Sequence, residues 1–306
     1  MNPYLEIRPE VATALEQGGA VVALESTVIS HGLPRPHNLE TARMMEAEIR
    51  KQGAVPATVG LLNGRLIVGL SSQEIELFAN AEGIHKVSRR DLSTVLQTRK
   101  PGATTVAATA WIASQAGISV FATGGIGGVH RGVQETLDIS ADLTELARTP
   151  VAVVCAVAKI ILDLPRTLEL LETLGVPVVG YRTNSFPAFY VRESGLDLDL
   201  RVESPEEAAR LMSVQWELGL SSGIVFCNPP PEASALGRAE AESLIEAALV
   251  SANSARIREK AVTPYLLGYL STLSGGASLK ANVALLVANA SLAGQIAVAL
   301  SALRKS

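Results

Sequence analysis

One lysine follows an apolar run that is typical of a long buried strand or of a strand that ends in a turn. Val151–Ala158 holds only apolar residues, and Lys159 comes directly after it. Burying a charged ammonium group is costly, whereas a desolvated neutral amine can attack a carbonyl carbon and form an imine. We therefore expect a nucleophilic role for Lys159. The alternative is a lysine at the edge of a following helix, Ile160–Gly175, whose stem is buried and whose charged end reaches water.

A glycine-rich loop lies upstream of this lysine, after an apolar strand predicted over Ile118–Thr123. Four of the five residues that follow the strand are glycine, so the backbone can approach a ligand closely where no Cβ atom intervenes. The spacing matches neither the dinucleotide-binding pattern nor the Walker loop. His130 and Arg131, just beyond the loop, are candidates for contact with a phosphate group.

Three carboxylates follow the glycine-rich loop: Glu135, Asp138 and Asp142. Ser140 is a candidate N-cap for a helix that begins among them. Oxygen ligands without paired histidines or thiolates suit hard cations, so the cluster favours magnesium or manganese over zinc if a metal binds. The alternative is an acidic helix start, which the helix macrodipole stabilises.

A further carboxylate, Glu25, ends the apolar run Ala20–Leu24. That run is typical of a parallel strand, and open α/β sheets bind ligands at the carboxyl ends of their strands. Glu25 is therefore either a functional acid at this edge of the sheet or a residue that caps or pairs with a neighbouring loop.

Two other segments are candidates for binding an anion. The basic run Ile84–Asp91 carries Lys86, and it is either a solvated face or an arm that brings its cations to a phosphate. Thr104 and Thr105 precede a helix predicted over Val106–Gln115. Free N–H groups at such a helix start bind anions, and the same threonines are also ordinary capping residues.

The elements that must position these residues alternate between helices and buried strands, which is typical of the α/β class. Asn63-Gly64 between two apolar runs predicts a hairpin. The pattern predicts a three-layer α/β/α sandwich with a central mixed, mostly parallel sheet and a small hairpin extension. No linker, repeat or charge block divides the chain, so we expect a single domain over residues 1–306. The predicted strands are 20–24, 56–62, 65–70, 118–123, 151–158, 177–181 and 223–227, and the predicted helices are 9–17, 38–52, 72–81, 106–115, 160–175, 204–218, 238–254, 264–273 and 279–303.

The composition argues against several other classes of function. The 306 residues carry a net charge of −4 and are 4% aromatic, so neither a basic surface nor a stacking platform for nucleic acid is expected. The apolar runs named above are far shorter than the roughly 20 residues that span a bilayer, and the N-terminus has no signal-peptide pattern. Cys155 and Cys227 are expected to be buried free thiols. We therefore expect a cytoplasmic protein without a membrane or nucleic-acid partner.

Several stretches of the chain carry a resemblance to a known family. They are A-L-E-S-T-V-I-S-H-G-L-P, K-V-S-R-R-D-L, G-A-T-T-V-A-A-T, F-A-T-G-G-I-G-G-V-H-R-G, L-D-I-S-A-D-L, V-C-A-V-A-K-I-I-L-D, F-P-A-F-Y, K-A-V-T-P-Y-L-L and S-L-K-A-N-V-A-L. From about Ala20 to Ala302 the chain resembles the pseudouridine-5′-phosphate glycosidase family, which includes indigoidine synthase A-like proteins. The resemblance implies reversible cleavage of the C–C glycosidic bond of pseudouridine 5′-phosphate to uracil and ribose 5-phosphate, in nucleobase catabolism. It also implies a divalent metal, typically manganese, with one ion per subunit of a homotrimer.

The resemblance also implies a role for each matching residue. Lys159 would be the nucleophile that forms an imine with the anomeric carbon of the opened ribose, and Glu25 would be the proton donor that assists ring opening. The C–C bond would then break in a retro-aldol-like step. Asp138 would bind the metal, and His130 and Asn289 would be second-tier candidates. The substrate would be held by Lys86, Val106, Ser140, Ala141 and Asp142.

The chain departs from the family pattern at several places, of which one flanks the expected nucleophile. The family's A-G-A-K-S-I-L-D becomes A-V-A-K-I-I-L-D, so Val157 and Ile160 add bulk on either side of Lys159. Two alternatives therefore remain: an imine-forming lyase or glycosidase on a different phosphorylated sugar, and a non-catalytic relative that binds a sugar phosphate. The other departures are Val133, Gln134, Asn184, Ser185 and Ala288.

Overall fold

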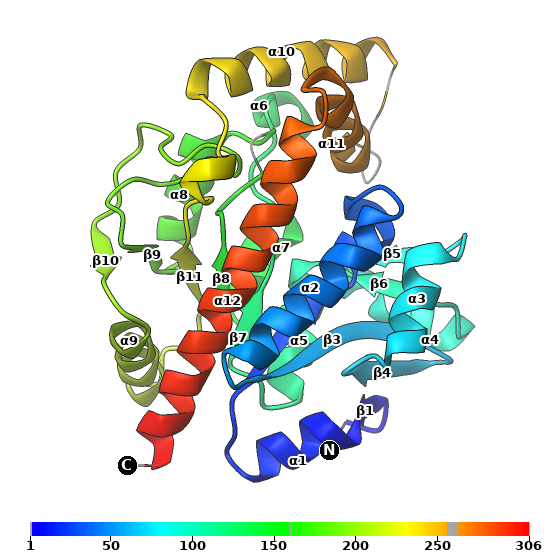
Figure 1. Cartoon of the computed structure of the whole chain (residues 1–306), viewed down its shortest axis with the longest axis vertical. Coiled ribbons are helices and arrows are strands. Elements are labelled where there is room, and N and C mark those ends of the chain that lie inside the picture. The colour runs from blue at the N-terminus through cyan, green and yellow to red at the C-terminus, as the bar shows by residue number, and fades with distance from the viewer. Residues whose placement is uncertain (1, 160, 256, 258–261, 306) are drawn as a thin grey trace.

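The computed structural model of the protein has a central sheet with helices packed on both of its faces (Figure 1). It describes residues 2–159, 161–255, 257 and 262–305. Within this part of the chain the strands run in the order β1-β4-β3-β2-β7-β8-β11-β9-β10, and β6 and β5 extend the sheet beside β3. The strands are β1 (Leu5–Ile7), β2 (Val21–Glu25), β3 (Val55–Leu62), β4 (Arg65–Val68), β5 (His85–Val87), β6 (Gly102–Thr104), β7 (Val120–Ala122), β8 (Ala152–Cys155), β9 (Val178–Tyr181), β10 (Leu200–Val202) and β11 (Ile224–Cys227).

The sheet is mostly parallel, as predicted. β3 is antiparallel to both β4 and β6, and the remaining pairs are parallel. Between β3 and β4, Asn63 and Gly64 have φ values of 53° and 77°. Two successive positive φ angles are those of the type I′ turn that an Asn-Gly pair favours. The predicted hairpin is therefore confirmed.

Two helical layers complete the three-layer sandwich. α2, α9 and α12 pack side by side on one face of the sheet, α5 and α7 pack together on the other, and α10 pairs with α11 (Figure 1). The helices are α1 (Pro9–Glu16), α2 (His37–Lys51), α3 (Ser72–Asn80), α4 (Leu92–Thr98), α5 (Val106–Gln115), α6 (Val133–Thr136), α7 (Ala141–Leu146), α8 (Leu164–Thr173), α9 (Pro205–Glu217), α10 (Arg238–Ser254), α11 (Val262–Leu273) and α12 (Ala277–Lys305), with short helical turns at Val28–Gly32, Arg89–Asp91 and Glu232–Ser234.

The apolar composition of α12 is that of a core helix. Among the described helices it is the one long and apolar enough to cross a membrane, and 56% of its apolar window is buried within the protein. It packs against α2, α9, β7 and β8. At Gly294 a Cβ atom would lie 2.9 Å from Cβ of Gln52, so a small residue is needed where α12 meets the end of α2.

The segment before Lys159 forms a strand followed by a turn, the second of the two structures predicted for Val151–Ala158. Its strand, β8, ends at Cys155. The chain then turns, because Val157 adopts a left-handed conformation with φ of 67°. Lys159 consequently lies in a loop rather than directly at the end of a strand.

Two helix starts differ from the prediction. α8 begins at Leu164, with the Asp163 side chain as its cap, rather than at Ile160, which lies outside the described residues. α2 begins at His37, one residue before the predicted start. Asn38 lies inside the first turn of α2, where its buried side-chain amide donates to backbone carbonyls of two neighbouring segments. These tertiary hydrogen bonds occupy a residue type that otherwise favours an N-cap.

The two cysteines are buried and free, as predicted. Cys155 and Cys227 stand opposite each other in the register of β8 and β11. Burial raises the pKa of the Cys155 thiol to about 12, so this thiol stays protonated at neutral pH and behaves as a small apolar group.

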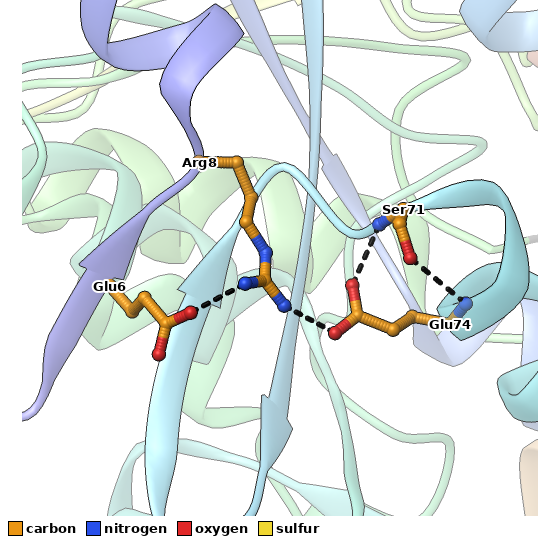
Figure 2. A network of polar contacts seen from close by, with 4 residues as sticks. All are labelled: Glu6, Arg8, Ser71 and Glu74. Atoms are coloured by element: carbon orange, nitrogen blue, oxygen red, sulfur yellow. Dashed lines mark hydrogen bonds and ion pairs between the residues drawn. The ribbon is translucent and has the colours of Figure 1, made fainter.

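A polar network anchors the N-terminal edge of the sheet (Figure 2). Arg8, which follows β1, donates to Glu6 and to Glu74. Glu74 also completes a capping box at the start of α3: its carboxylate accepts the Ser71 N–H at 2.7 Å, and Ser71 Oγ accepts the Glu74 N–H at 3.3 Å. The same carboxylate therefore caps α3 and holds the edge strand to it.

Candidate active site

One pocket brings together three of the predicted site residues. Glu25 is the last residue of β2, Lys86 lies in β5, and Lys159 lies in the loop after β8; all three line the pocket. The site therefore lies at the carboxyl ends of β2 and β8, where open α/β sheets bind ligands. The pocket encloses about 460 Å³ of empty space, part of it open to solvent. Its other lining residues are Thr27, Val28, His31, Gly32, Leu33, Thr123, Gly124, Gly125, Phe189, Asn282 and Leu286.

Glu25 is a buried carboxyl group in this pocket. Its relative exposure is 7%, and its Oε1 accepts a hydrogen bond from the Thr123 hydroxyl. Burial raises the pKa of Glu25 above its ordinary value, although the Lys159 charge and the bond from Thr123 act in the opposite direction. Because burial prevails, the neutral acid persists to higher pH than it does for an exposed glutamate. This arrangement suits a proton donor.

Lys159 is carried by a loop that hydrogen-bonds to the glycine-rich loop beside it. The Ile126 N–H donates to the Val157 carbonyl at 2.8 Å, and the Lys159 N–H donates to the Ile126 carbonyl at 3.3 Å. Val157 is fully buried, and its left-handed φ is unusual for a β-branched residue. Both backbone polar groups of Ile126 thus bond to the loop that carries Lys159, and the side chain of Lys159 lines the pocket.

The predicted substrate-binding residues Val106 and Ser140–Asp142 lie at the starts of α5 and α7 rather than in the pocket lining. Asp142 joins these two helix starts to the glycine-rich loop. Its Oδ1 accepts the Ala107 N–H at 2.9 Å, and its Oδ2 accepts the Gly127 N–H at 2.8 Å. Both carboxylate oxygens are therefore bonded to the backbone, and the negative charge of Asp142 contributes to the raised pKa of Glu25.

Strand pairing places Lys86 beside the start of α5. Lys86 stands opposite Ala103 in the parallel pair of β5 and β6, and the Thr105 N–H donates to the Val87 carbonyl at 2.9 Å. Burial and, second to it, the Lys86 charge lower the pKa of His31. The pocket thus holds a cation next to a ten-residue helix whose first N–H groups have no partner inside the helix. That combination suits an anionic group.

The glycines of the loop make room for the protein's own atoms. A Cβ atom on Gly125 would lie 2.7 Å from the Val157 carbonyl oxygen, and one on Gly127 would lie 2.2 Å from Ser140 Oγ. Gly124 and Gly125 line the pocket. The missing side chains of the loop therefore also let it pack against the Lys159 loop and the start of α7.

The three predicted acidic residues do not converge. Glu135 and Asp138 are exposed, and Asp142 bonds to the backbone. Within the described residues, no group of three or more His, Cys, Asp and Glu is placed to hold a metal ion. Asp138 has a side chain 47% exposed, with Oδ2 3.8 Å from Nδ1 of His130. One exposed carboxylate fits a hard cation that keeps most of its water and takes further oxygen ligands from a substrate.

Further polar and aromatic residues line the pocket or lie behind it. Asn282 lines the pocket, whereas Asn289, one heptad further along α12, is fully buried and donates to the Thr123 carbonyl at 2.8 Å. His31 also lines the pocket, and its buried Nε2 has no hydrogen-bond partner in the described part of the chain. Phe189 supplies an aromatic wall. The two asparagines, one heptad apart in α12, therefore differ in role: Asn282 lines the pocket, and Asn289 holds the Thr123 carbonyl behind it.

Comparison with known proteins identifies the family. The family model described as indigoidine synthase A like protein matches residues 10–299. The pseudouridine-5′-phosphate glycosidase of Caldanaerobacter subterraneus subsp. tengcongensis is 55% identical over 305 residues, which cover 100% of this chain and 99% of that protein. The pseudouridine-5′-phosphate glycosidase of Hahella chejuensis is 53% identical over 97% of this chain and 98% of that protein.

Two solved structures share the fold. The prealnumycin C-glycosynthase AlnA, solved in complex with ribulose 5-phosphate, has a TM-score of 0.92 and 43% identity and covers 100% of this chain and 99% of that chain. The indigoidine synthase A-like protein of Thermotoga maritima has a TM-score of 0.88 and 39% identity, with 97% and 96% covered. The fold and the pocket are thus those of an α/β enzyme. The chain belongs to the pseudouridine-5′-phosphate glycosidase family of indigoidine synthase A like proteins, as its sequence motifs predict.

Proposed function

We propose that the protein cleaves the C–C glycosidic bond of pseudouridine 5′-phosphate reversibly, giving uracil and ribose 5-phosphate in nucleobase catabolism. The observation that carries the proposal is a single pocket that holds a buried acid, Glu25, and an amine, Lys159. Relatives that are 55% and 53% identical over nearly the whole chain bear the name of this activity.

The two groups supply what cleavage at a carbon-linked base needs: a nucleophile for C1′ and a proton for O4′. Lys159 forms a bond from Nζ to C1′ while the C1′–O4′ bond breaks, and Glu25 gives its proton to O4′. The nitrogen releases a proton after it bonds to C1′. When the C1′–C5 bond then breaks, the nitrogen lone pair forms the C1′=N imine, the bonding pair passes to C5 of the base, and C5 takes up the released proton. Water hydrolyses the imine and restores the free amine. The scheme needs a nucleophile and a separate acid in one pocket.

The substrate would be bound by Lys86 together with the backbone at Val106 and Ser140–Asp142, and the 5′-phosphate would be met by Lys86, His130 and the glycine-rich loop. Lys86 lies in the pocket wall, and Asp142 holds the starts of α5 and α7 against the glycine-rich loop. Because the chain has a net charge of −4, a local site of this kind is needed to attract an anion.

We also propose one divalent ion per subunit, manganese in the first instance, held by Asp138 with His130 beside it. When bound, such an ion supplies positive charge for substrate oxygens. Electron paramagnetic resonance of added Mn²⁺ should show bound ion for wild type and weaker binding for Asp138→Asn. Light scattering tests the proposed homotrimer, and cytoplasmic location remains an expectation from the sequence.

Turnover of the named substrate tests the proposed function. Purified protein is incubated with pseudouridine 5′-phosphate and Mn²⁺, and uracil is measured by chromatography. We expect uracil and ribose 5-phosphate in equal amounts, and no product from uridine 5′-phosphate, whose base is linked through nitrogen. Absence of uracil from pseudouridine 5′-phosphate would rule the proposal out.

A second candidate function is the same bond chemistry with a different base or aromatic acceptor. It is favoured by the likeness to the C-glycosynthase structure, which is 43% identical over the whole chain. An imine between ribose 5-phosphate and Lys159 without any release of uracil would favour this second candidate.

A further inference from the structure

Four residues from four elements form one chain of hydrogen bonds that ends at Glu25. Asn228, which follows β11, donates from Nδ2 to Oδ1 of Asn289 in α12 at 3.0 Å. Asn289 donates from Nδ2 to the backbone carbonyl of Thr123 at 2.8 Å. Thr123, which follows β7, donates its hydroxyl to Oε1 of Glu25. The chain thus joins the carboxyl ends of β11, β7 and β2 through α12.

The members of this chain have little freedom to move. Thr123 and Asn289 are fully buried, and the Thr123 N–H also donates to the Val154 carbonyl at 3.1 Å. Both backbone polar groups of Thr123 and both ends of the Asn289 amide are therefore bonded. Because a buried polar group that loses its partner is destabilising, Thr123 and its hydroxyl are fixed relative to Glu25.

We propose that Thr123 is a positioning residue that directs the acid proton of Glu25 to Oε2, and that the Asn289–Asn228 amide pair holds Thr123 in place. The proposal rests on the proposed role of Glu25 as proton donor. A neutral carboxyl group accepts best through its carbonyl oxygen, and the Thr123 hydroxyl occupies Oε1. Every molecule then presents the same protonated oxygen, Oε2. Asn289 acts through Thr123 rather than as a contact to substrate.

A pair of Thr123 substitutions tests the proposal. Thr123→Val removes the hydroxyl with little change in shape, and Thr123→Ser keeps it. We expect kcat to fall about three- to tenfold in Thr123→Val with KM little changed. The bond from Thr123 favours the charged form of Glu25. Its loss should therefore move the alkaline limb of the kcat profile to higher pH, by roughly half a unit to one unit. Thr123→Ser should restore both properties.

An infrared measurement reports on the same bond without substrate. The difference spectrum between wild type and Glu25→Gln isolates the carbonyl band of neutral Glu25. We expect this band at higher frequency in Thr123→Val, because a hydrogen bond to the carbonyl oxygen has been lost, and at the wild-type frequency in Thr123→Ser. Asn289→Leu, checked for folding by its thermal melt, should shift the band in the same direction although the threonine is present.

The outcomes separate this proposal from the proposed function. If Thr123→Val and Thr123→Ser share one band position and one pH profile, the positioning role is wrong. If Thr123→Val raises KM and leaves the band unchanged, Thr123 contacts substrate and does not direct Glu25. If Asn289→Leu leaves the band in place, the amide pair has no part in it. If the band shifts as expected but wild type releases no uracil, the proposed function fails and the assignment of the proton to Oε2 stands.

Discussion

Glu25 and Lys159 line one pocket although they come from strands that are not neighbours. Glu25 ends β2 and Lys159 follows β8, and β7 lies between these two strands in the sheet. The charge of Lys159 lowers the pKa of Glu25, but burial raises that pKa by more. An acid whose pKa is raised and an amine thus line the same pocket, which is the pairing that the proposed cleavage of a C-glycoside uses.

The first prediction is a pH limit set by Glu25. A proton donor is active while protonated, so activity should fall as the pH rises through the pKa of Glu25. Because that pKa is raised, the fall should come at a pH above the usual range of glutamate. The measurement is kcat as a function of pH. Glu25→Gln is the control: it should lower kcat by about a hundredfold or more and abolish this limb, and persistence of the limb in Glu25→Gln would assign it to another group.

The second prediction concerns Asp142, which lies at the start of α7 and bonds to the start of α5 and to the glycine-rich loop. Asp142→Asn keeps one acceptor oxygen and sets an amide N–H₂ against a backbone N–H donor. We expect the free energy of unfolding to fall by about 2–3 kcal/mol, with a higher KM for the phosphorylated substrate. Asp138→Asn is the matched control, because its exposed side chain should change stability by about 0.5 kcal/mol or less. Urea unfolding measures both, and equal losses would show that Asp142 has no special structural role.

The third prediction concerns the left-handed conformation of Val157. At an ordinary position glycine is less stable than alanine by roughly 0.5–1 kcal/mol. At the φ of 67° found here, alanine keeps a conformational cost of about 1–2 kcal/mol that glycine avoids. Val157→Gly should therefore unfold no more easily than Val157→Ala. Val153, a buried residue of β8, is the control position, where alanine should be the more stable. If the alanine variant were more stable than the glycine variant at both positions, this account of Val157 would be contradicted.

The sequence was informative where one local signal decides the structure. Asn63-Gly64 predicted the hairpin because few residue pairs accept two positive φ angles, and the apolar run before Glu25 predicted a buried strand that ends at the site. Motif resemblance then paired Glu25 with Lys159, which no local rule connects. The structure confirms that the two residues share a pocket; their chemical roles remain predictions.

The remaining features depend on partners that are distant in the chain. Asp142 resembled a metal ligand or a helix-start acid, and its backbone partner in α5 is visible only in the fold. The Val157 turn interrupts a run whose composition favours a strand, because tertiary pairing with Ile126 overrides local preference. The structural role of Asn289 also depends on distant residues, since its partners, Thr123 and Asn228, follow two different strands of the sheet.

The most direct test of the account is to trap the imine on Lys159. The protein is treated with ribose 5-phosphate and borohydride, digested, and mapped by mass spectrometry. The account predicts one sugar phosphate adduct on Lys159 and none on Lys86, the other lysine of the same pocket, with the adduct absent and uracil release abolished in Lys159→Ala. No adduct on Lys159, or undiminished uracil release by Lys159→Ala, would contradict it.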